Sequence, residues 1–295
     1  MRHPCRLLAA LAAFVLAGCA GPTPTQTSGG SLRIDGRTPA AIVSPAEAQR
    51  IRKAIPARYQ GKVLAAEALG RVIYEHATLA EDAAQRLSPD WSDTFPQPPV
   101  GWLVERTASG LHVLFLIKAD DRLRIAALAS RGGAGNKLHV VRPGTPRALT
   151  PQQLVLWQAR QLAFSRKFRP CSTRYDPAVI PVHAGGADQI GVYLLPESSD
   201  PKRLFLGGYR VVTINADGDE ILHTHAFTHS CASLERTPGA VAAAVTETRS
   251  DSPTAPQVYA SLRYGLPVRV TTKGNALVWT VESGRIVLKG PAGKQ

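Results

Sequence analysis

The chain has 295 residues, 44% of them hydrophobic, and a formal net charge of +13. This hydrophobic share is ordinary for a globular protein and allows a sizeable core, in one large domain or two modest ones. After the N-terminal segment no apolar run approaches the roughly eighteen residues of a membrane-spanning helix, so we expect none in the body of the protein.

The first eighteen residues have the parts of a secretory signal. Arg2 and Arg6 supply positive charge at the start, and Leu7–Leu16 is a run of uncharged apolar residues. A helix of ten residues rises about 15 Å, half of the roughly 30 Å hydrocarbon core of a bilayer. Residues 1–18 are therefore predicted to be a signal peptide and not a membrane-spanning helix.

The tetrapeptide Leu16-Ala17-Gly18-Cys19 resembles the lipobox of bacterial lipoproteins at all four positions. This resemblance implies cleavage before Cys19, a thioether lipid on its sulfur and acylation of the new N-terminus, with palmitate among the acyl groups. Two or more acyl chains give stable membrane attachment without a transmembrane helix. Ala20, where an Asp would imply retention at the inner membrane, favours the periplasmic side of the outer membrane. The alternative is a plain secreted protein in which Cys19 is incidental.

Residues 19–43 are predicted to form a flexible tether, because Ala20–Gly30 is small, polar and rich in Pro, Gly and Thr. Residues 44–145 are predicted to form helices followed by a β meander. Ser44 and Pro45 are start signals of a helix that Pro56 ends, and a second helix is expected from about Gly61 to Leu87. Strands are expected within 101–130, with turns at 108–110 and 119–121, and at 137–142.

Basic residues are concentrated in one stretch of the chain. Residues 101–170 contain twelve Lys or Arg and only Glu105, Asp120 and Asp121 as acids. Such a bias could favour anionic partners, among them lipopolysaccharide, acidic peptidoglycan groups or nucleic acid. The alternative is a solvated basic face, and export together with the lack of a nucleic-acid-binding signature disfavours nucleic acid.

Residues 146–295 are predicted to form a helix and a second antiparallel sheet, which makes the fold class α+β. Thr150 and Pro151 open the helix, which is expected to reach about Phe168. The turn at Asp217-Gly218 predicts a hairpin between 209–215 and 220–227. Further strands are expected at 191–195, 258–262, 268–272, 277–281 and 285–288.

A histidine cluster is the one constellation that could carry chemistry. His223 and His225 would point to the same face of a strand and could share a Zn²⁺ ion, with His229 or Cys231 as a further ligand. The His-x-His pair faintly resembles the JAMM metalloprotease signature, which continues with a Ser and then an Asp. Here Ser233 and Arg236 follow Ser230, so the third ligand is missing. The alternative, which we favour, is an outward hairpin face with no metal and no cofactor.

Two cysteines remain once Cys5 and Cys19 are assigned to the signal and the lipid. Cys171 and Cys231 would lie in an oxidising compartment, so a disulfide between them is predicted. In the chain-entropy description a loop of this length contributes about 4 kcal/mol to stability.

The C-terminal half is similar to an uncharacterised group of proteobacterial envelope proteins. The similarity rests on the segments 191–196, 207–211, 226–231 and 278–282 and on the turn at Asp217-Gly218. It implies an α+β fold and transfers no activity. We therefore expect a membrane-anchored periplasmic lipoprotein that binds an anionic envelope component or another envelope protein and is not an enzyme. The alternatives are a zinc-dependent hydrolase using His223 and His225, and an immunity or inhibitor lipoprotein.

Overall fold

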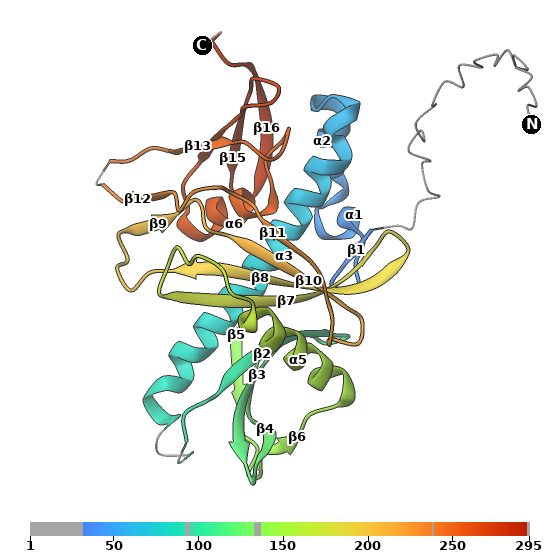
Figure 1. Ribbon diagram of the computed structural model, residues 1–295, viewed down its shortest axis with the longest axis vertical. Coiled ribbons are helices and arrows are strands. Elements are labelled where there is room, and N and C mark those ends of the chain that lie inside the picture. Colours follow the sequence, from blue (N-terminus) through green and yellow to red (C-terminus); the bar gives the residue numbers. More distant parts are fainter. Residues whose placement is uncertain (1–31, 92–94, 96, 133–136, 238, 294–295) are drawn as a thin grey trace, which may run out of the picture.

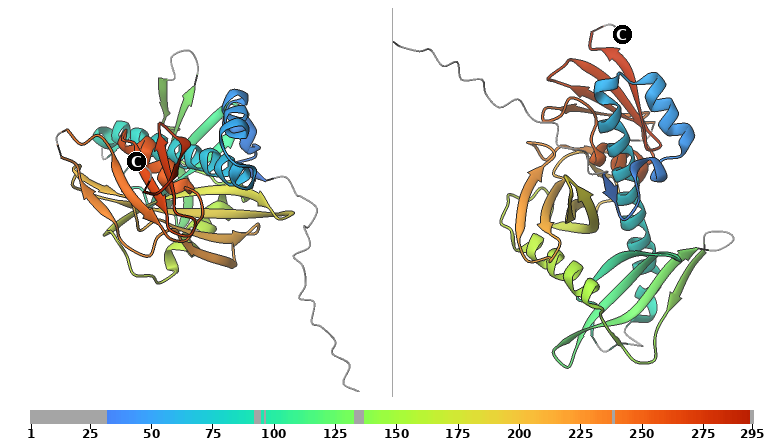
Figure 2. Two further views of the ribbon diagram at one scale, coloured as in Figure 1. Left: turned by 90° about the horizontal axis from the view of Figure 1, so that it is seen from above. Right: turned by 90° about the vertical axis from the view of Figure 1, so that its right-hand side faces the viewer.

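A long helix organises the computed structural model, which describes residues 32–293 except 92–94, 96, 133–136 and 238. This helix, α3 (Ala57–Leu87), has 31 residues and is about 46 Å long. Three of the four sheets in the described residues follow one another along it, as the two side views show (Figures 1 and 2). The fourth is the short pair β9 (Arg203–Phe205) and β12 (Ser233–Glu235). The predicted signal peptide, residues 1–18, and Cys19 lie outside the described residues.

Each third of α3 packs on a different sheet. Tyr59, Val63 and Ala66 join the core of the C-terminal sheet. Val72 and Ile73, further along the helix, lie in the core of the central sheet. The last third, with Leu79 and Leu87, packs on the sheet formed by residues 101–148. The helix therefore crosses the predicted division of the chain and buries apolar side chains against sheets on both sides of it.

The sheet packed on the end of α3 is the predicted meander. Its strands are β2 (Gly101–Thr107), β3 (Gly110–Ala119), β4 (Arg122–Gly132), β5 (Lys137–Val141) and β6 (Arg147–Ala148). The continuous apolar run Val113–Ile117 of β3 is buried on both faces, as is typical of a covered strand. One face contacts α3, and the other packs against α5 (Pro151–Ser165) and the central sheet.

The central sheet has the order β1-β7-β8-β10-β11, and all its neighbouring strands are antiparallel. Its strands are β1 (Arg33–Ile34), β7 (Arg174–Ala184), β8 (Ala187–Glu197), β10 (Arg210–Asn215) and β11 (Ile221–Ala226). One face is covered by α5, and the other by α3 and the short helix α1 (Pro39–Ile42). The predicted hairpin is present as β10 and β11, with Gly218 at φ +79° in the turn.

The C-terminal sheet contains one parallel pair. Its order is β13 (Ala243–Glu247), β14 (Val268–Thr272), β15 (Leu277–Glu282) and β16 (Arg285–Pro291), and β13 is parallel to β14. Parallel neighbours need a crossover, which is supplied by α6 (Ala255–Tyr264). The predicted strand at 258–262 is therefore wrong. Thr254 precedes the helix and Gly265 ends it at φ +62°, so both helix signals were present in the sequence.

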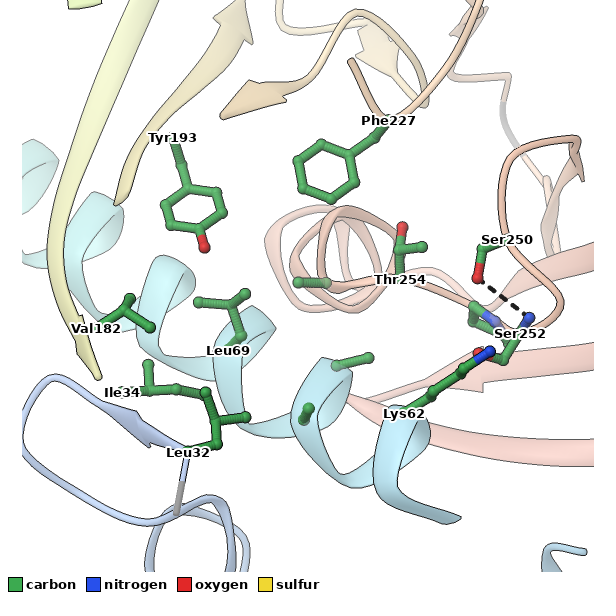
Figure 3. Close-up of a pocket in the computed structure, with 14 residues that line it drawn as sticks. Leu32, Ile34, Lys62, Leu69, Val182, Tyr193, Phe227, Ser250, Ser252 and Thr254 are labelled. Atoms are coloured by element: carbon green, nitrogen blue, oxygen red, sulfur yellow. Dashed lines mark hydrogen bonds between the residues drawn. The ribbon is translucent and has the colours of Figure 1, made fainter. Parts of the chain in front are cut away.

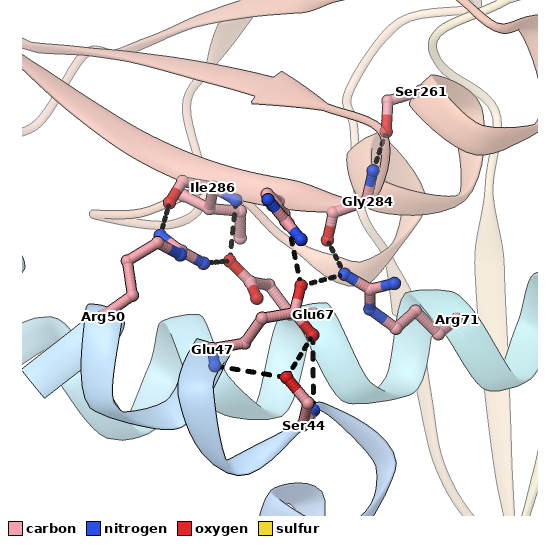
Figure 4. A network of polar contacts seen from close by, with 9 residues as sticks. Ser44, Glu47, Arg50, Glu67, Arg71, Ser261, Gly284 and Ile286 are labelled. Carbon is pink, nitrogen blue, oxygen red and sulfur yellow. Dashed lines mark hydrogen bonds and ion pairs between the residues drawn. The ribbon is translucent and has the colours of Figure 1, made fainter.

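Ion pairs attach this sheet to the N-terminal helices (Figure 4). Glu67 of α3 is fully buried, and its Oε1 accepts hydrogen bonds from Arg50 at 2.6 Å and from the backbone N–H of Ile286 at 2.7 Å. Arg50 belongs to α2 (Pro45–Ala54) and also donates to the Ile286 carbonyl at 2.9 Å. Glu47 pairs with Arg71 and Arg285 nearby. The α2–α3 pair therefore clamps the β15–β16 hairpin.

The predicted tether is too long at its C-terminal end. Ile34 pairs with Val182 of β7 and is only 2% exposed, and Val43 is completely buried after α1. These two side chains fold back onto the core, so at least residues 33–43 belong to the body of the protein. The predicted starts of α2 and α5 are confirmed, because Ser44 and Thr150 each form a capping box.

Several boundaries differ from the sequence analysis by a few residues. Helix α3 begins at Ala57, directly after Pro56, and α5 ends at Ser165, short of Phe168. Strand β8 is longer than the expected 191–195 because it pairs along its whole length with β7. Among the described residues no helix is long and apolar enough to span a bilayer.

Candidate functional site

A mainly apolar pocket of about 370 Å³ lies where α3, the central sheet and the start of α6 meet (Figure 3). Its walls come from six separate parts of the chain. The aliphatic and aromatic lining side chains are Leu32, Ile34, Ala65, Ala66, Leu69, Val182, Tyr193, Phe227, Pro253 and Ala255. Lys62, Ser250, Ser252 and Thr254 stand on the opposite side from Tyr193 and Val182 and give the pocket a polar rim.

The strand register places the aromatic lining on one face of the central sheet. Tyr193 pairs with Val211 of β10, and Val211 pairs with His225 of β11, so all three side chains share that face. The Tyr193 ring lies over Gly191, where an added Cβ would come within 2.9 Å of the ring atom Cε2. The absence of a side chain at Gly191 therefore provides the space that the Tyr193 ring occupies. Burial of this ring raises the pKa of the Tyr193 phenol.

The wall opposite Tyr193 is the segment 248–254, and Glu247 shapes it. Glu247 is 1% exposed, and its Oε1 accepts hydrogen bonds from the backbone N–H groups of Arg249 at 2.7 Å and Ser250 at 3.2 Å. Its Oε2 accepts one from Gln257 of α6 at 2.9 Å. The Glu247 carboxylate thus joins the turn after β13 to the first turn of α6, because it accepts hydrogen bonds from both segments.

Two further contacts hold the same wall from outside. Lys62 of α3 pairs with Asp251 at 2.9 Å, and the Asn275 side chain donates to the Asp251 carbonyl at 2.7 Å. The segment is therefore joined to α3 and to the β14–β15 turn, and the pocket is a built feature of the fold.

A row of rings leads from the pocket along β11. The Phe227 ring is stacked beside Tyr193 at 6.5 Å between centroids, and His225 meets Phe227 edge-on at 5.0 Å. His223 stacks on His225 at 6.3 Å. The two histidines share one face of the strand, as the sequence analysis predicted, and this face is the one that carries the pocket.

The structure does not assemble the zinc site of the alternative hypothesis. His229 lies beyond the end of β11, where its Nδ1 is 3.1 Å from a guanidinium nitrogen of Arg249, and Cys231 is in a disulfide. Burial lowers the pKa of His225, and the charges of Arg249 and His223 lower it further, against an opposing effect of Glu247. In the described part of the chain no group of three or more His, Cys, Asp or Glu side chains is arranged to hold a metal ion.

The predicted disulfide is present between Cys171 and Cys231, with the Cα atoms 5.2 Å apart. It packs against Gly208, where the φ of +85° and the Cβ of Cys171, 2.6 Å from an added Cβ, both require glycine. The backbone N–H of Gly208 donates to Thr228 Oγ1 at 3.0 Å. The bridge therefore holds the chain that follows Phe227, one residue beyond the pocket lining.

A half-buried charge cluster lies away from the pocket, where β7 and β8 meet α3 and α6. Arg263 of α6 pairs with Glu81 and lies 3.7 Å from Glu197, which also accepts a hydrogen bond from the Tyr259 hydroxyl at 3.4 Å. Burial, and after it the neighbouring carboxylates of Asp176 and Glu81, together raise the pKa of Glu197 to about 6 against the opposing charge of Arg263. This cluster links the sheet to both helices.

Some of the basic residues of 101–170 are paired with acids from elsewhere in the chain. Arg106 donates to Asp35 at 2.6 Å and to Glu75 at 2.8 Å, and Arg131 pairs with Asp82 of α3. Arg160 lies over the Trp157 ring at 4.8 Å, and burial lowers its pKa to about 10. The charge bias of this stretch is thus partly neutralised by tertiary contacts that the sequence did not reveal.

Comparison of the chain with known families, characterised proteins and solved structures yields no match. The pocket itself was missed by the sequence analysis. Its walls are distant in sequence, and Gly191-x-Tyr193, with a small residue beneath a ring, is the one local signal that could have indicated part of it.

Proposed function

We propose that this chain is a lipid-anchored envelope protein whose folded body binds an apolar group in the pocket between α3 and the central sheet and is not an enzyme. The observation that carries this proposal is the pocket lining, which is mainly hydrocarbon and comes from six segments of the chain. A volume of about 370 Å³ falls within the 300 to 1,000 Å³ that is usual for ligand sites.

The position of the pocket fits a protein held at a membrane. Leu32 lines the pocket, and twelve residues separate it from Cys19. An extended chain spans at most about 3.6 Å per residue, so the lipid on Cys19 would keep Leu32 within about 45 Å of the membrane surface. The lipobox and Ala20 support the periplasmic side of the outer membrane as the place of attachment. A binding site at this distance is suited to apolar molecules that leave or enter the bilayer.

A series of straight-chain alcohols tests the proposal, because each buried methylene contributes about 0.8 kcal/mol. We expect the affinity to rise about fourfold per methylene from octanol onwards, until the pocket is full. The measurement is isothermal titration calorimetry on the full chain carrying Cys19→Ser, so that no lipid of the protein competes.

Two matched variants of α3 locate the site. Ala65→Trp fills the pocket from within, and Ala84→Trp makes the same change at an exposed position of the same helix. We expect Ala65→Trp to weaken dodecanol binding at least tenfold and Ala84→Trp to leave it unchanged. Equal binding by both variants, or no dependence on chain length, would contradict the proposal.

A further inference from the structure

The end of the pocket at Phe227 is bordered by groups that carry or can carry positive charge. His225 contacts the Phe227 ring, and His223 stacks on His225. Arg249 directly precedes the lining residue Ser250, and its charge acts on His225. The guanidinium donates to His229 Nδ1 at 3.1 Å. Three imidazoles and one guanidinium therefore gather beside an apolar cavity.

The positive charge of Arg249 has little compensation within the protein. The charged or titratable neighbours acting on His225 are Arg249, His223 and Glu247. Glu247 is buried, and both its oxygens already accept hydrogen bonds from the wall at 248–257. Over the described residues Arg249 forms no ion pair with a carboxylate. By contrast, Lys62 on the polar rim pairs with Asp251 at 2.9 Å.

We propose that the pocket takes a single-chain carboxylate amphiphile of the fatty-acid type. The hydrocarbon chain lies between Leu69, Val182 and Phe227, and the carboxylate lies beside Arg249 and His225. A guanidinium and an imidazole both donate to a carboxylate, and such charge-assisted hydrogen bonds are about twice as strong as neutral ones. The pocket volume lies near the lower end of the range for ligand sites, which favours a ligand with one hydrocarbon chain over a ligand with two. This inference rests on the proposed function and adds the chemical class of the ligand.

The test compares dodecanoate with dodecanol, two ligands with the same tail and different head groups. Calorimetry uses the full chain carrying Cys19→Ser, with Arg249→Gln as the variant and Arg122→Gln as a control that removes an exposed, distant charge. We expect dodecanoate to bind about tenfold more tightly than dodecanol, which corresponds to one charge-assisted hydrogen bond. Arg249→Gln should remove this preference without weakening dodecanol, and Arg122→Gln should retain it.

The His225 imidazole gives a second readout that needs no variant. A bound carboxylate favours the charged imidazole, so saturating dodecanoate should raise the pKa of His225 followed by NMR, and dodecanol should not. Equal affinity of the two ligands together with an unchanged His225 pKa would overturn this inference and leave the proposed function standing. Binding of neither ligand would overturn both. Tighter binding of dodecyl phosphate than of dodecanoate would replace the carboxylate by a phosphate head group.

Discussion

Helix α6 crosses α3 at Gly70 so closely that any side chain there must push the helices apart. A Cβ added to Gly70 would lie 2.5 Å from the Cβ of Val258 and 2.8 Å from the carbonyl oxygen of Ala255. Carbon atoms reach their optimal contact at about 3.5 to 4.0 Å, so α6 would have to move by about 1 Å. Val258 is completely buried, which leaves it no room to yield.

The substitution Gly70→Ala has two opposing effects on stability. Alanine in a helix interior is favoured over glycine by about 1 kcal/mol. Overpacking a filled core costs about 1 to 3 kcal/mol, and the cost here lies in the upper part of that range because three α6 atoms are contacted at once. We expect a net loss of about 1 to 2 kcal/mol, measured as a lower urea midpoint followed by circular dichroism.

Gly61→Ala is the matched control in the same helix. Nothing lies within 4 Å of a Cβ at Gly61, so this variant should gain about 1 kcal/mol. Because Ala255 lines the pocket, Gly70→Ala should also weaken dodecanol binding, and Gly61→Ala should not. If Gly70→Ala proved as stable as Gly61→Ala, the close α3–α6 packing described above would be refuted.

Three further predictions concern charge, the disulfide and the lipid. The pKa of Glu197 is raised to about 6 in the fold, so the native state binds the Glu197 proton more tightly than the unfolded state does. The free energy of unfolding should therefore fall by about 2 kcal/mol as the pH rises from about 4.5 through 6. In urea titrations, the loss of unfolding free energy between pH 4.5 and pH 7 should be smaller for Glu197→Gln than for wild type. An equal loss in both proteins would assign the pH dependence to another group. Replacing Cys171 and Cys231 by Ala should lower the free energy of unfolding by about 4 kcal/mol, which would be measured as a lower Tm. Wild type in dithiothreitol should have the Tm of the double variant. A double variant with the Tm of the oxidised wild type would contradict this prediction. In cells given radiolabelled palmitate, wild type should incorporate the label and Cys19→Ser should not. Equal labelling of the two proteins would contradict the proposed lipid anchor on Cys19.

The parts of the fold that the sequence predicted are those set by local signals. Ser44 and Thr150 start helices because their side chains satisfy free backbone N–H groups of the first turn. Asp217-Gly218 makes the hairpin because glycine accepts the positive φ of its turn. The shared face of His223 and His225 follows in the same way from the two-residue period of a strand.

The parts that the sequence did not predict depend on distant partners. Residues 258–262 resembled a strand because Val258, Ala260 and Leu262 alternate, but the parallel pairing of β13 with β14 requires a helix between them. Ile34 belongs to the fold because it pairs with a strand almost 150 residues later. The pocket has the same origin, since its walls meet only when α3, the central sheet and α6 are in place. No spacing along the chain encodes such a meeting.

A crystal structure of the protein with 12-bromododecanoate would test the central claim most directly, because bromine is located by its anomalous scattering. We expect a single strong bromine peak between Leu69 and Val182, with the carboxylate beside Arg249 and His225. A pocket that stays empty while bromine is found elsewhere on the protein would contradict it.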